Sequence, residues 1–402
     1  MEIKKYRLAN GPTIVHVPTE TNSVALQVLV NVGSINENKN NNGISHFIEH
    51  LLFKGSKKFK TNKEITHEIE KLGGYINAYT SKERTCFHIK ILNKHFDKAL
   101  DVLLEVVQNP LFREKDIEKE RDIISREIDI VFDDPRFYQW ILLNRTLYEG
   151  SPIAVPTYGS KEIIMKLTKK DILDHYLKYY EPGNIIIIVV GKVSNIKNKI
   201  ERKFKLKENK QEKITIEAKP LKKVKEIIEK RKIASSYLVL GYRAPKRTEN
   251  DSYVLDIIHS ILGKGMSGRL FDEIRNKRGL AYDVGSAYIS ERDYAYFTVY
   301  ANVQKKNIQK VKDLINKELK LRNLTEKELK ESKDFIEGNF YLVIENTEHL
   351  ADIIGFWEQT SKSEDLNDYV KKIKKVSLDD VKKAVKEYFS KPYAIAIIEG
   401  EN

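Results

Sequence analysis

The sequence predicts an α+β protein built from two homologous halves, each a mostly antiparallel sheet with helices packed on it. Two helix-then-strand patterns, residues 167–193 and 376–402, align with each other without a gap. A second, gapped similarity joins segments that begin at His67 and Asp272, and both read as a helix, a glycine turn and a hairpin. Because helical and strand patterns alternate within each half, the class is α+β.

The aligned segments also share their helix start signals. Ser377 follows Thr168 by 209 positions, and each is succeeded three residues later by an aspartate, as in a capping box. A stretch rich in Lys and Glu, with little apolar content, separates the halves. We therefore expect one domain over residues 1–207, a linker over 208–226 and a second domain over 227–402.

The composition narrows the class of protein. The 402 residues are 41% hydrophobic, which is enough to form cores, and the single cysteine excludes an internal disulfide. The net charge is +13, but the lysines are dispersed among glutamates, which indicates solvated helix faces and predicts no nucleic-acid partner. No apolar run approaches the length of a membrane span, and the N-terminus lacks a secretory pattern, so we expect a cytoplasmic protein without membrane contacts.

One predicted helix, within residues 44–56, is apolar around most of its surface yet carries three polar side chains on one face. His46, Glu49 and His50 occupy positions i, i+3 and i+4. Burying such groups costs on the order of 1–3 kcal/mol each unless they are satisfied. Two imidazoles at this spacing reach one metal ion from a single helix. A hydrogen-bonded pair of core histidines is the alternative.

A catalytic zinc site needs a third protein ligand besides two histidines. The segment 114–135 has helical periodicity, and it places Glu120, Ile124, Glu127 and Val131 in one partly apolar stripe. A charged surface helix with Glu–Arg pairs is the alternative interpretation of this segment.

The spacing His46-x-x-Glu49-His50 is the inverted zinc motif of the inverzincins, and residues 51–55 continue it as in the pitrilysin/insulinase family of metallopeptidases. The chain resembles the β-subunit of mitochondrial processing peptidase and its short bacterial relatives. Glu127 follows His50 by 77 positions, the spacing at which this family places its third ligand. The resemblance implies one Zn²⁺ per chain, held by His46, His50 and Glu127.

The resemblance also implies roles for residues around the metal. Glu49 would act as general base and then as general acid. Glu120, which matches a supporting glutamate of the family, would orient a ligand from the second shell. Asn77 and Ala78 would lie on an edge strand to which an extended peptide substrate adds.

Longer family members have four such domains around a chamber, whereas this chain supplies two. The resemblance therefore implies a half-clamshell that pairs with a copy of itself or with a paralogue. In the longer enzymes an Arg/Tyr pair grips the substrate from the half opposite the zinc, and Arg275 and Tyr282 match its spacing. The implied function is a zinc endopeptidase that hydrolyses peptides or unfolded segments inside the chamber. A catalytically silent partner subunit is the alternative.

Overall fold

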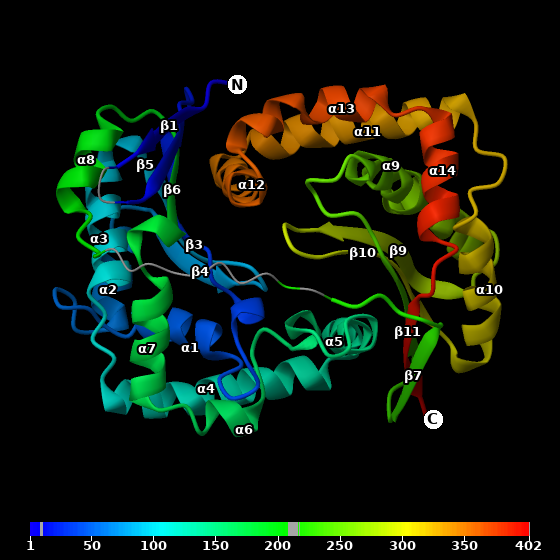
Figure 1. Ribbon diagram of the computed structural model, residues 1–402, viewed down its shortest axis with the longest axis horizontal. Helices are drawn as coiled ribbons and strands as arrows, with labels where there is room; N and C mark the ends of the chain where they lie inside the picture. The colour runs from blue at the N-terminus through cyan, green and yellow to red at the C-terminus, as the bar shows by residue number, and fades with distance from the viewer. Residues whose placement is uncertain (9–10, 208–215, 217, 402) are drawn as a thin grey trace. The chain divides into compact units, whose positions relative to one another are not determined.

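The computed structural model describes residues 1–8, 11–207, 216 and 218–401 (Figure 1). The predicted linker falls mostly on residues 208–215 and 217, which lie outside the described residues. The described chain forms two compact units. The first comprises Met1–Asp129, Val155–Thr215 and Leu342–Asn367, and the second comprises Ile130–Ala154, Ile216–Tyr341 and Asp368–Asn402.

The first unit contains a six-stranded sheet in the order β1-β2-β6-β3-β5-β4. Only the β2–β6 pair is parallel, and the other neighbours are antiparallel. The strands are β1 (Lys4–Arg7), β2 (Thr13–Val17), β3 (Ser23–Val30), β4 (Tyr75–Thr80), β5 (Thr85–Leu92) and β6 (Ile185–Val190). Strand β4 forms one edge of this sheet. Of the strands, it makes the most extensive contact with α1.

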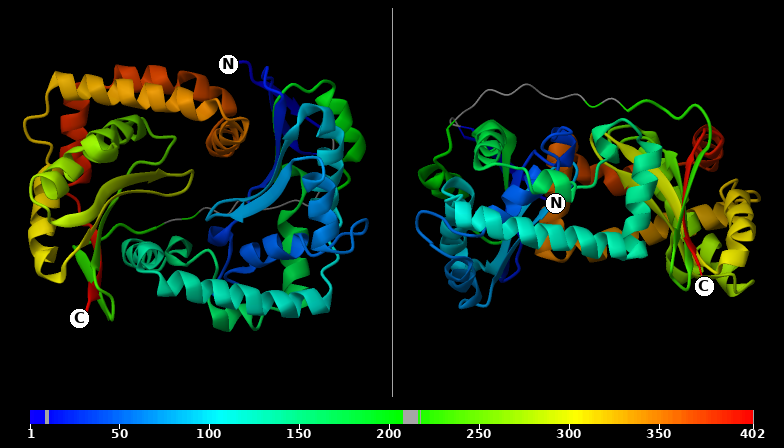
Figure 2. Two further views of the ribbon diagram at one scale, coloured as in Figure 1. Left: turned by 180° about the vertical axis from the view of Figure 1, so that it is seen from behind. Right: turned by 90° about the horizontal axis from the view of Figure 1, so that it is seen from below.

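Helices cover both faces of the first sheet. Helix α3 packs on β3 and β5, and α12 crosses the opposite face over β3 and β6 (Figures 1 and 2). The side chain of Gln27 on β3 donates to Asp352 of α12 at 2.7 Å. The α-helices of this unit are α1 (Ile44–Leu52), α2 (Asn62–Glu70), α3 (Phe96–Gln108), most of α4 (Glu114–Asp133), α6 (Lys161–Ile164), α7 (Lys169–Tyr179), α8 (Ile196–Lys203) and α12 (Thr347–Thr360).

Among the described residues, the second unit repeats the same sheet without a counterpart of β1. Its strand order is β7-β11-β8-β10-β9, and again a single pair, β7–β11, is parallel. The strands are β7 (Lys225–Arg231), β8 (Ser236–Arg243), β9 (Ala281–Ser290), β10 (Ala295–Val303) and β11 (Ala394–Gly400). The α-helices are α5 (Pro135–Leu147), α9 (Asp251–Gly263), α10 (Ile308–Glu318), most of α11 (Glu326–Ile344), α13 (Tyr369–Lys375) and α14 (Leu378–Tyr388).

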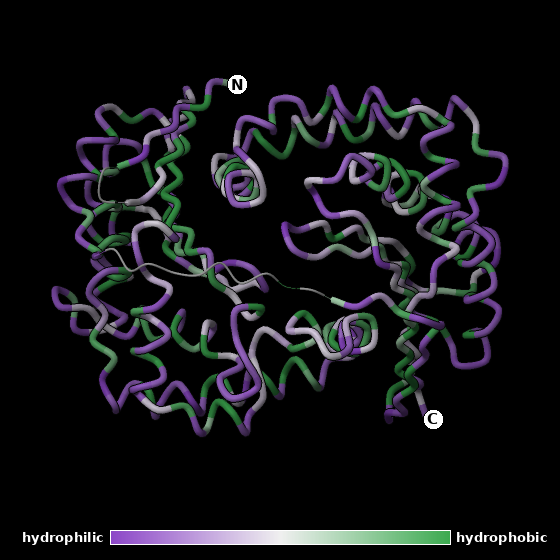
Figure 3. The backbone as a smooth tube through the Cα atoms, in the orientation of Figure 1, coloured by the Kyte–Doolittle hydropathy of each residue, from purple (hydrophilic) through white to green (hydrophobic). Residues whose placement is uncertain are grey.

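The internal repeat is visible in both sequence and structure. Helices α7 and α14 begin at equivalent positions, and in both the capping box forms, with Thr168 bonding Asp171 and Ser377 bonding Asp380. Strands β6 and β11 follow these helices. Every residue of β6 is buried, and the strand is hydrophobic along its length (Figure 3). The predicted α+β class, with a mostly antiparallel sheet and packed helices in each half, is confirmed.

Each unit includes a helix from the other half of the sequence. Helix α5 precedes the second half in the chain but packs on β8 and β11, and the side chain of Leu143 fills the space beside Gly241. Helix α12 belongs to the second half but packs on the first sheet. In the described part of the chain, no helix is both long and apolar enough to cross a bilayer.

Candidate metal centre

Helix α1 presents the predicted polar face. Phe47, Ile48, Leu51 and Leu52 are buried in the first unit, as their apolar pattern predicts. The helix packs against β4, β5 and α7, which leaves its polar face toward α4. His46, Glu49 and His50 therefore occupy one mostly buried side of a helix whose apolar residues anchor it to the fold.

Three ligand atoms converge at this face. The Nε2 atoms of His46 and His50 lie 3.2 Å apart, and Oε2 of Glu127 on α4 lies 3.8 Å from the first and 3.5 Å from the second. All candidate ligand atoms fall within 4.8 Å of one another. Among the described residues, this is the one group of three or more His, Cys, Asp or Glu side chains so placed.

The separations fit a tetrahedral zinc ion. Zinc binds nitrogen and oxygen at about 2.0–2.2 Å, which puts neighbouring ligand atoms roughly 3.3–3.5 Å apart. His50 donates through Nδ1 to Glu120, which only accepts, so the Nε2 atom of a neutral His50 carries a lone pair. A proton on Nε2 of His46 could be donated to only one of the two facing atoms, Nε2 of His50 or Oε2 of Glu127. A cation at the centre would bind all three atoms. The donor set of two imidazoles and one carboxylate is one that zinc accepts.

Glu120 lies behind His50, away from the cluster of ligand atoms. Its side chain is fully buried, accepts from Nδ1 of His50 at 3.0 Å and pairs with Nζ of Lys54 at 2.7 Å. Burial raises the pKa of Glu120, but the contacts with His50 and Lys54 outweigh burial and hold that pKa below its usual range. A charged Glu120 fixes the orientation of the His50 ring, which is the role of a carboxylate behind a metal-bound histidine.

Glu49 lies beside the ligands and is held by strand β4. Oγ1 of Thr80, at the end of β4, donates to Oε2 of Glu49 at 2.5 Å. Burial raises the pKa of Glu49 above its ordinary value, although the Thr80 bond opposes that change. The carboxyl group therefore has one oriented oxygen and a proton affinity higher than that of an exposed glutamate.

The two histidines have opposite pKa shifts. Burial lowers the pKa of His46 to about 3, so its imidazole is neutral at physiological pH. Burial also lowers the pKa of His50, but the bond to Glu120 and the charges of Glu127 and Glu49 outweigh burial and raise it. Since metal ligation requires neutral imidazoles, the lowered pKa of His46 favours ligation and the raised pKa of His50 opposes it.

The predicted substrate residues lie on β4. Asn77 is exposed and Ala78 is half-buried on this edge strand of the first sheet. The backbone N–H of Ala78 donates to the side-chain Oδ1 of Asn77 at 2.9 Å. The Asn77 side chain thus satisfies the backbone donor of Ala78 on this edge strand.

Arg275 and Tyr282 lie together in the second unit. Arg275 is in a π-helix, Phe271–Asn276, and its guanidinium lies 5.4 Å from the ring centre of Tyr282. Tyr282, at the start of β9, is 78% exposed. Both residues line a cavity of about 490 Å³ whose other walls come from α5, β8 and β10, with Trp140 and Tyr300 among them.

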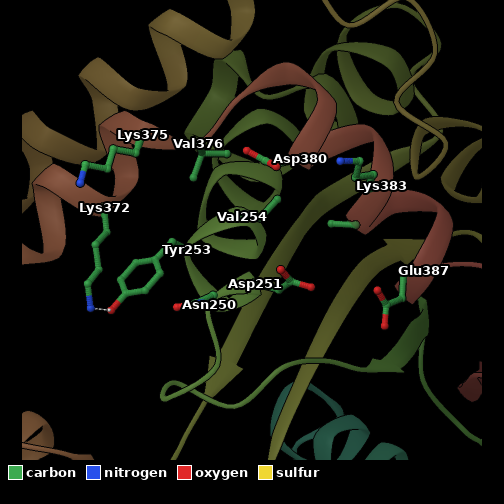
Figure 4. Close-up of a pocket in the computed structure, with 11 residues that line it drawn as sticks. Asn250, Asp251, Tyr253, Val254, Lys372, Lys375, Val376, Asp380, Lys383 and Glu387 are labelled. Carbon is green, nitrogen blue, oxygen red and sulfur yellow. Dashed lines mark hydrogen bonds between the residues drawn. The ribbon is translucent and has the colours of Figure 1, made fainter.

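A second cavity of the second unit contains none of the predicted site residues. It measures about 430 Å³ and lies among α9, α13 and α14 (Figure 4). Lys372 and Lys383 share its walls with Asp251 and Asp380. These acids have structural partners, because Asp251 accepts from Tyr388 and Asp380 caps α14. The mixed charge gives this cavity no preference for a ligand of either sign.

Two residues near α1 were not predicted from the sequence. Glu37, only 7% exposed, accepts backbone N–H groups of Gly43 and Ser45 at the start of α1. Tyr158 places its ring edge-on to that of His46, with ring centres 5.6 Å apart. Glu37 sits in an asparagine-rich polar stretch typical of a solvated loop, and no local periodicity marks either residue.

Comparison with known families agrees with the geometry. The model of the insulinase family, peptidase family M16, matches residues 13–161, which include all three candidate ligands. A second model, called peptidase M16 inactive domain, matches residues 166–335, a range that does not include the inverted motif.

Similar proteins match most of the chain. A Bacillus subtilis protein called an uncharacterized zinc protease is 32% identical over 98% of both chains. A Rickettsia felis protein of the same description is 32% identical, covering 87% of this chain and 85% of that one. The crystal structure of a protease from Helicobacter pylori superposes with a TM-score of 0.93, at 26% identity and 99% coverage of each chain. The resemblance drawn from the inverted motif is thus confirmed, and the chain belongs to peptidase family M16, the insulinase family.

Proposed function

We propose that this protein is a zinc-dependent endopeptidase. The observation that carries the proposal is the convergence of His46, His50 and Glu127, with Glu49 alongside and Glu120 behind. The names of the similar proteins support the same activity, since two of them are called zinc proteases. One Zn²⁺ per chain is expected from this single cluster.

The chemistry follows from the residues around the ligands. His46, His50 and Glu127 would hold a zinc ion, which would supply a Lewis acid for the substrate carbonyl and activate water near neutral pH. Glu49 takes the proton of the attacking water and returns it to the leaving amine. Because Thr80 already donates to Oε2, Oε1 is the atom of Glu49 that is free to carry this proton. The raised pKa of Glu49 brings proton uptake and release closer to neutral pH.

The substrate is proposed to be a peptide or an unfolded segment. An extended chain can add to the open edge of β4, where Ala78 offers its N–H once Asn77 releases it. Main-chain pairing of this kind requires an extended substrate, so a folded protein is expected to be a poor one. The position of Thr80 on the same strand connects the substrate edge to Glu49.

We further propose that catalysis takes place in a chamber between two subunits, in a homodimer or a heterodimer with a paralogue. Arg275 and Tyr282 would complete the zinc site of the partner and stabilise the oxyanion. Mixing Glu49→Gln subunits with Tyr282→Phe subunits tests this idea. Pairing in trans should restore one good site per dimer, and activity no higher than in either singly substituted dimer would contradict it.

The peptidase itself is tested with a quenched, unstructured peptide and a folded protein that contains the same sequence. We expect cleavage of the free peptide, loss of cleavage after metal removal by a chelator, and recovery when zinc is restored. Zinc binding without cleavage of any peptide would instead favour the silent-subunit alternative. Cleavage that survives complete metal removal would contradict the proposed mechanism.

A further inference from the structure

The metal-bearing helix begins without a capping side chain of its own. Gly43 occupies the N-cap position with a left-handed backbone (φ 93°), and it provides no side chain to accept the first helical N–H groups. Free N–H groups at a buried helix start need acceptors. In α1 these come from Glu37, which lies six residues before the cap: Oε2 accepts from Gly43 at 2.6 Å and Oε1 from Ser45 at 2.9 Å.

Glycine at position 43 is required by the close approach of another segment. A Cβ at Gly43 would lie 2.5 Å from the carbonyl oxygen of Tyr158, and one at Gly159 would lie 2.2 Å from that of Asn42. Both glycines have positive φ angles. The helix start is therefore packed directly against the segment that carries Tyr158, and an ordinary capping residue cannot replace Gly43 without moving it.

Glu37 also lies near a half-buried lysine that holds this segment. Nζ of Lys82 donates to the carbonyl of Val155 at 2.9 Å, and the Glu37 carboxylate favours the charged form of Lys82. Burial raises the pKa of Glu37 to about 7 and lowers that of Lys82 to about 8. Keeping a carboxylate in this position is costly, and the two backbone bonds and the nearby cation offset part of that cost.

We propose that Glu37 is a positioning residue for the metal centre, which sets the start of α1 and thereby the placement of the His46 and His50 rings against Glu127. The inference rests on the proposed metal site. It extends that site to a residue that touches neither the metal ligands' side chains nor the substrate. Ser45, the second residue bonded by Glu37, directly precedes His46 in the helix.

The test compares Glu37→Gln with a matched control, Glu181→Gln. Glu181 is equally buried, at 6% exposure, and its Oε2 accepts the Gly183 N–H of a short 3₁₀ helix, Pro182–Asn184, in the same unit. Glu37→Gln must lose one of its two backbone bonds, because an amide keeps a single acceptor oxygen, whereas Glu181→Gln can turn that oxygen toward Gly183 and keep its one bond. Glu37→Asp, which keeps the charge but shortens the side chain, serves as a milder second variant.

Three readouts distinguish positioning from general destabilisation: zinc affinity, the visible spectrum of Co²⁺ in the site, and amide exchange of Gly43 and Ser45 in metal-free protein. We expect Glu37→Gln to weaken zinc binding roughly tenfold or more, to change the Co²⁺ spectrum and to accelerate both amides. Glu37→Asp should show a smaller loss, and Glu181→Gln should leave all three unchanged.

Unchanged zinc affinity in a folded Glu37→Gln protein would overturn the inference. Equal losses in Glu37→Gln and Glu181→Gln would also overturn it, because they would show an effect on stability alone. If the wild-type protein binds no zinc, the proposed metal site fails first and the positioning role falls with it.

Discussion

Helices α1 and α9 occupy corresponding places in the two units, yet only α1 carries a cluster of ligand atoms. Each helix follows the central strand of its sheet and packs near the edge strand, β4 or β9. In α9 the polar groups are paired locally: Nδ1 of His259 lies 2.8 Å from Ser286, and Asp256 forms a bidentate pair with Arg247. In α1 two imidazole nitrogens face each other and a carboxylate instead.

The comparison separates what the fold requires from what the chemistry requires. Both helices bury apolar residues in the same way, so the fold alone does not call for histidines on α1. Polar groups on α9 are satisfied by donor–acceptor pairs, which is the ordinary solution for a buried face. On α1 the three ligand atoms face one another, and a bound cation, as proposed, would satisfy all three at once.

Removing a candidate metal ligand should have the largest effect on zinc binding and hydrolysis. Glu127→Gln takes away the one negative ligand of the cluster, so we expect zinc affinity and peptide hydrolysis to fall by more than about 100-fold, the upper range for residues that only support ligands. The counterpart change, His259→Asn in α9, should cost about 1 kcal/mol of stability through its lost hydrogen bond and leave zinc content intact. Metal analysis and peptide assays decide between these outcomes, and equal zinc loss in both variants would contradict the assignment.

The support behind His50 should have a smaller effect. Glu120→Gln retains the shape of the side chain but removes the charge that orients the His50 ring. Zinc affinity should therefore fall about 10- to 100-fold, as for other residues that orient ligands. Glu118→Gln, on the exposed face of the same helix, is the matched control and should not change the affinity. A chelator competition titration measures both, and identical affinities would remove Glu120 from the site.

Acid sensitivity should reveal buried histidines outside the cluster. Burial lowers the pKa of His175 to about 3, from 6.5 in the unfolded chain, so the folded form rejects a proton that the unfolded form takes up. Stability from the neutral ring is thus complete above pH 6.5 and is lost as the pH falls toward 3. Relative to His175→Gln, the wild-type protein should lose about 2 kcal/mol between pH 6.5 and 5. Denaturant unfolding at both pH values measures the free energy of unfolding of the two proteins. An equal loss in the wild-type protein and in His175→Gln would contradict the prediction.

The repeated helix starts should respond alike. Thr168→Ala in α7 and Ser377→Ala in α14 each remove one capping side chain from an equivalent helix. We expect each to lower the free energy of unfolding by about 1 kcal/mol without any effect on zinc binding. Thermal or chemical unfolding of the two variants measures the costs, and a large difference would show that the repeat is not energetically symmetric.

Local sequence patterns predicted much of this structure. The capping signals at Thr168 and Ser377 and the apolar face of α1 depend on neighbours close in sequence, and the structure contains all of them. The helical stripe of Glu120 and Glu127 also formed: Glu120 is fully buried and Glu118 is exposed. These features follow from helical periodicity, which acts within a few turns.

Features that depend on distant contacts were not predicted. The packing of α5 on the second sheet and of α12 on the first joins residues far apart in the chain, such as Leu143 with Gly241 and Gln27 with Asp352. The hydrophobic periodicity of a helix predicts its buried face but not the sheet on which that face packs. Glu37 was missed for a related reason, because its burial comes from the surrounding fold and its own segment is polar.

The most direct test of the central claim combines zinc content with peptide hydrolysis for the wild-type protein and Glu49→Gln. Glu49 lies beside the ligands without belonging to the cluster, so its amide should leave metal binding intact. We predict one zinc per chain in both proteins, with hydrolysis by Glu49→Gln reduced by about 10²- to 10⁴-fold. Absence of zinc from the wild-type protein, or full activity of Glu49→Gln, would contradict the account.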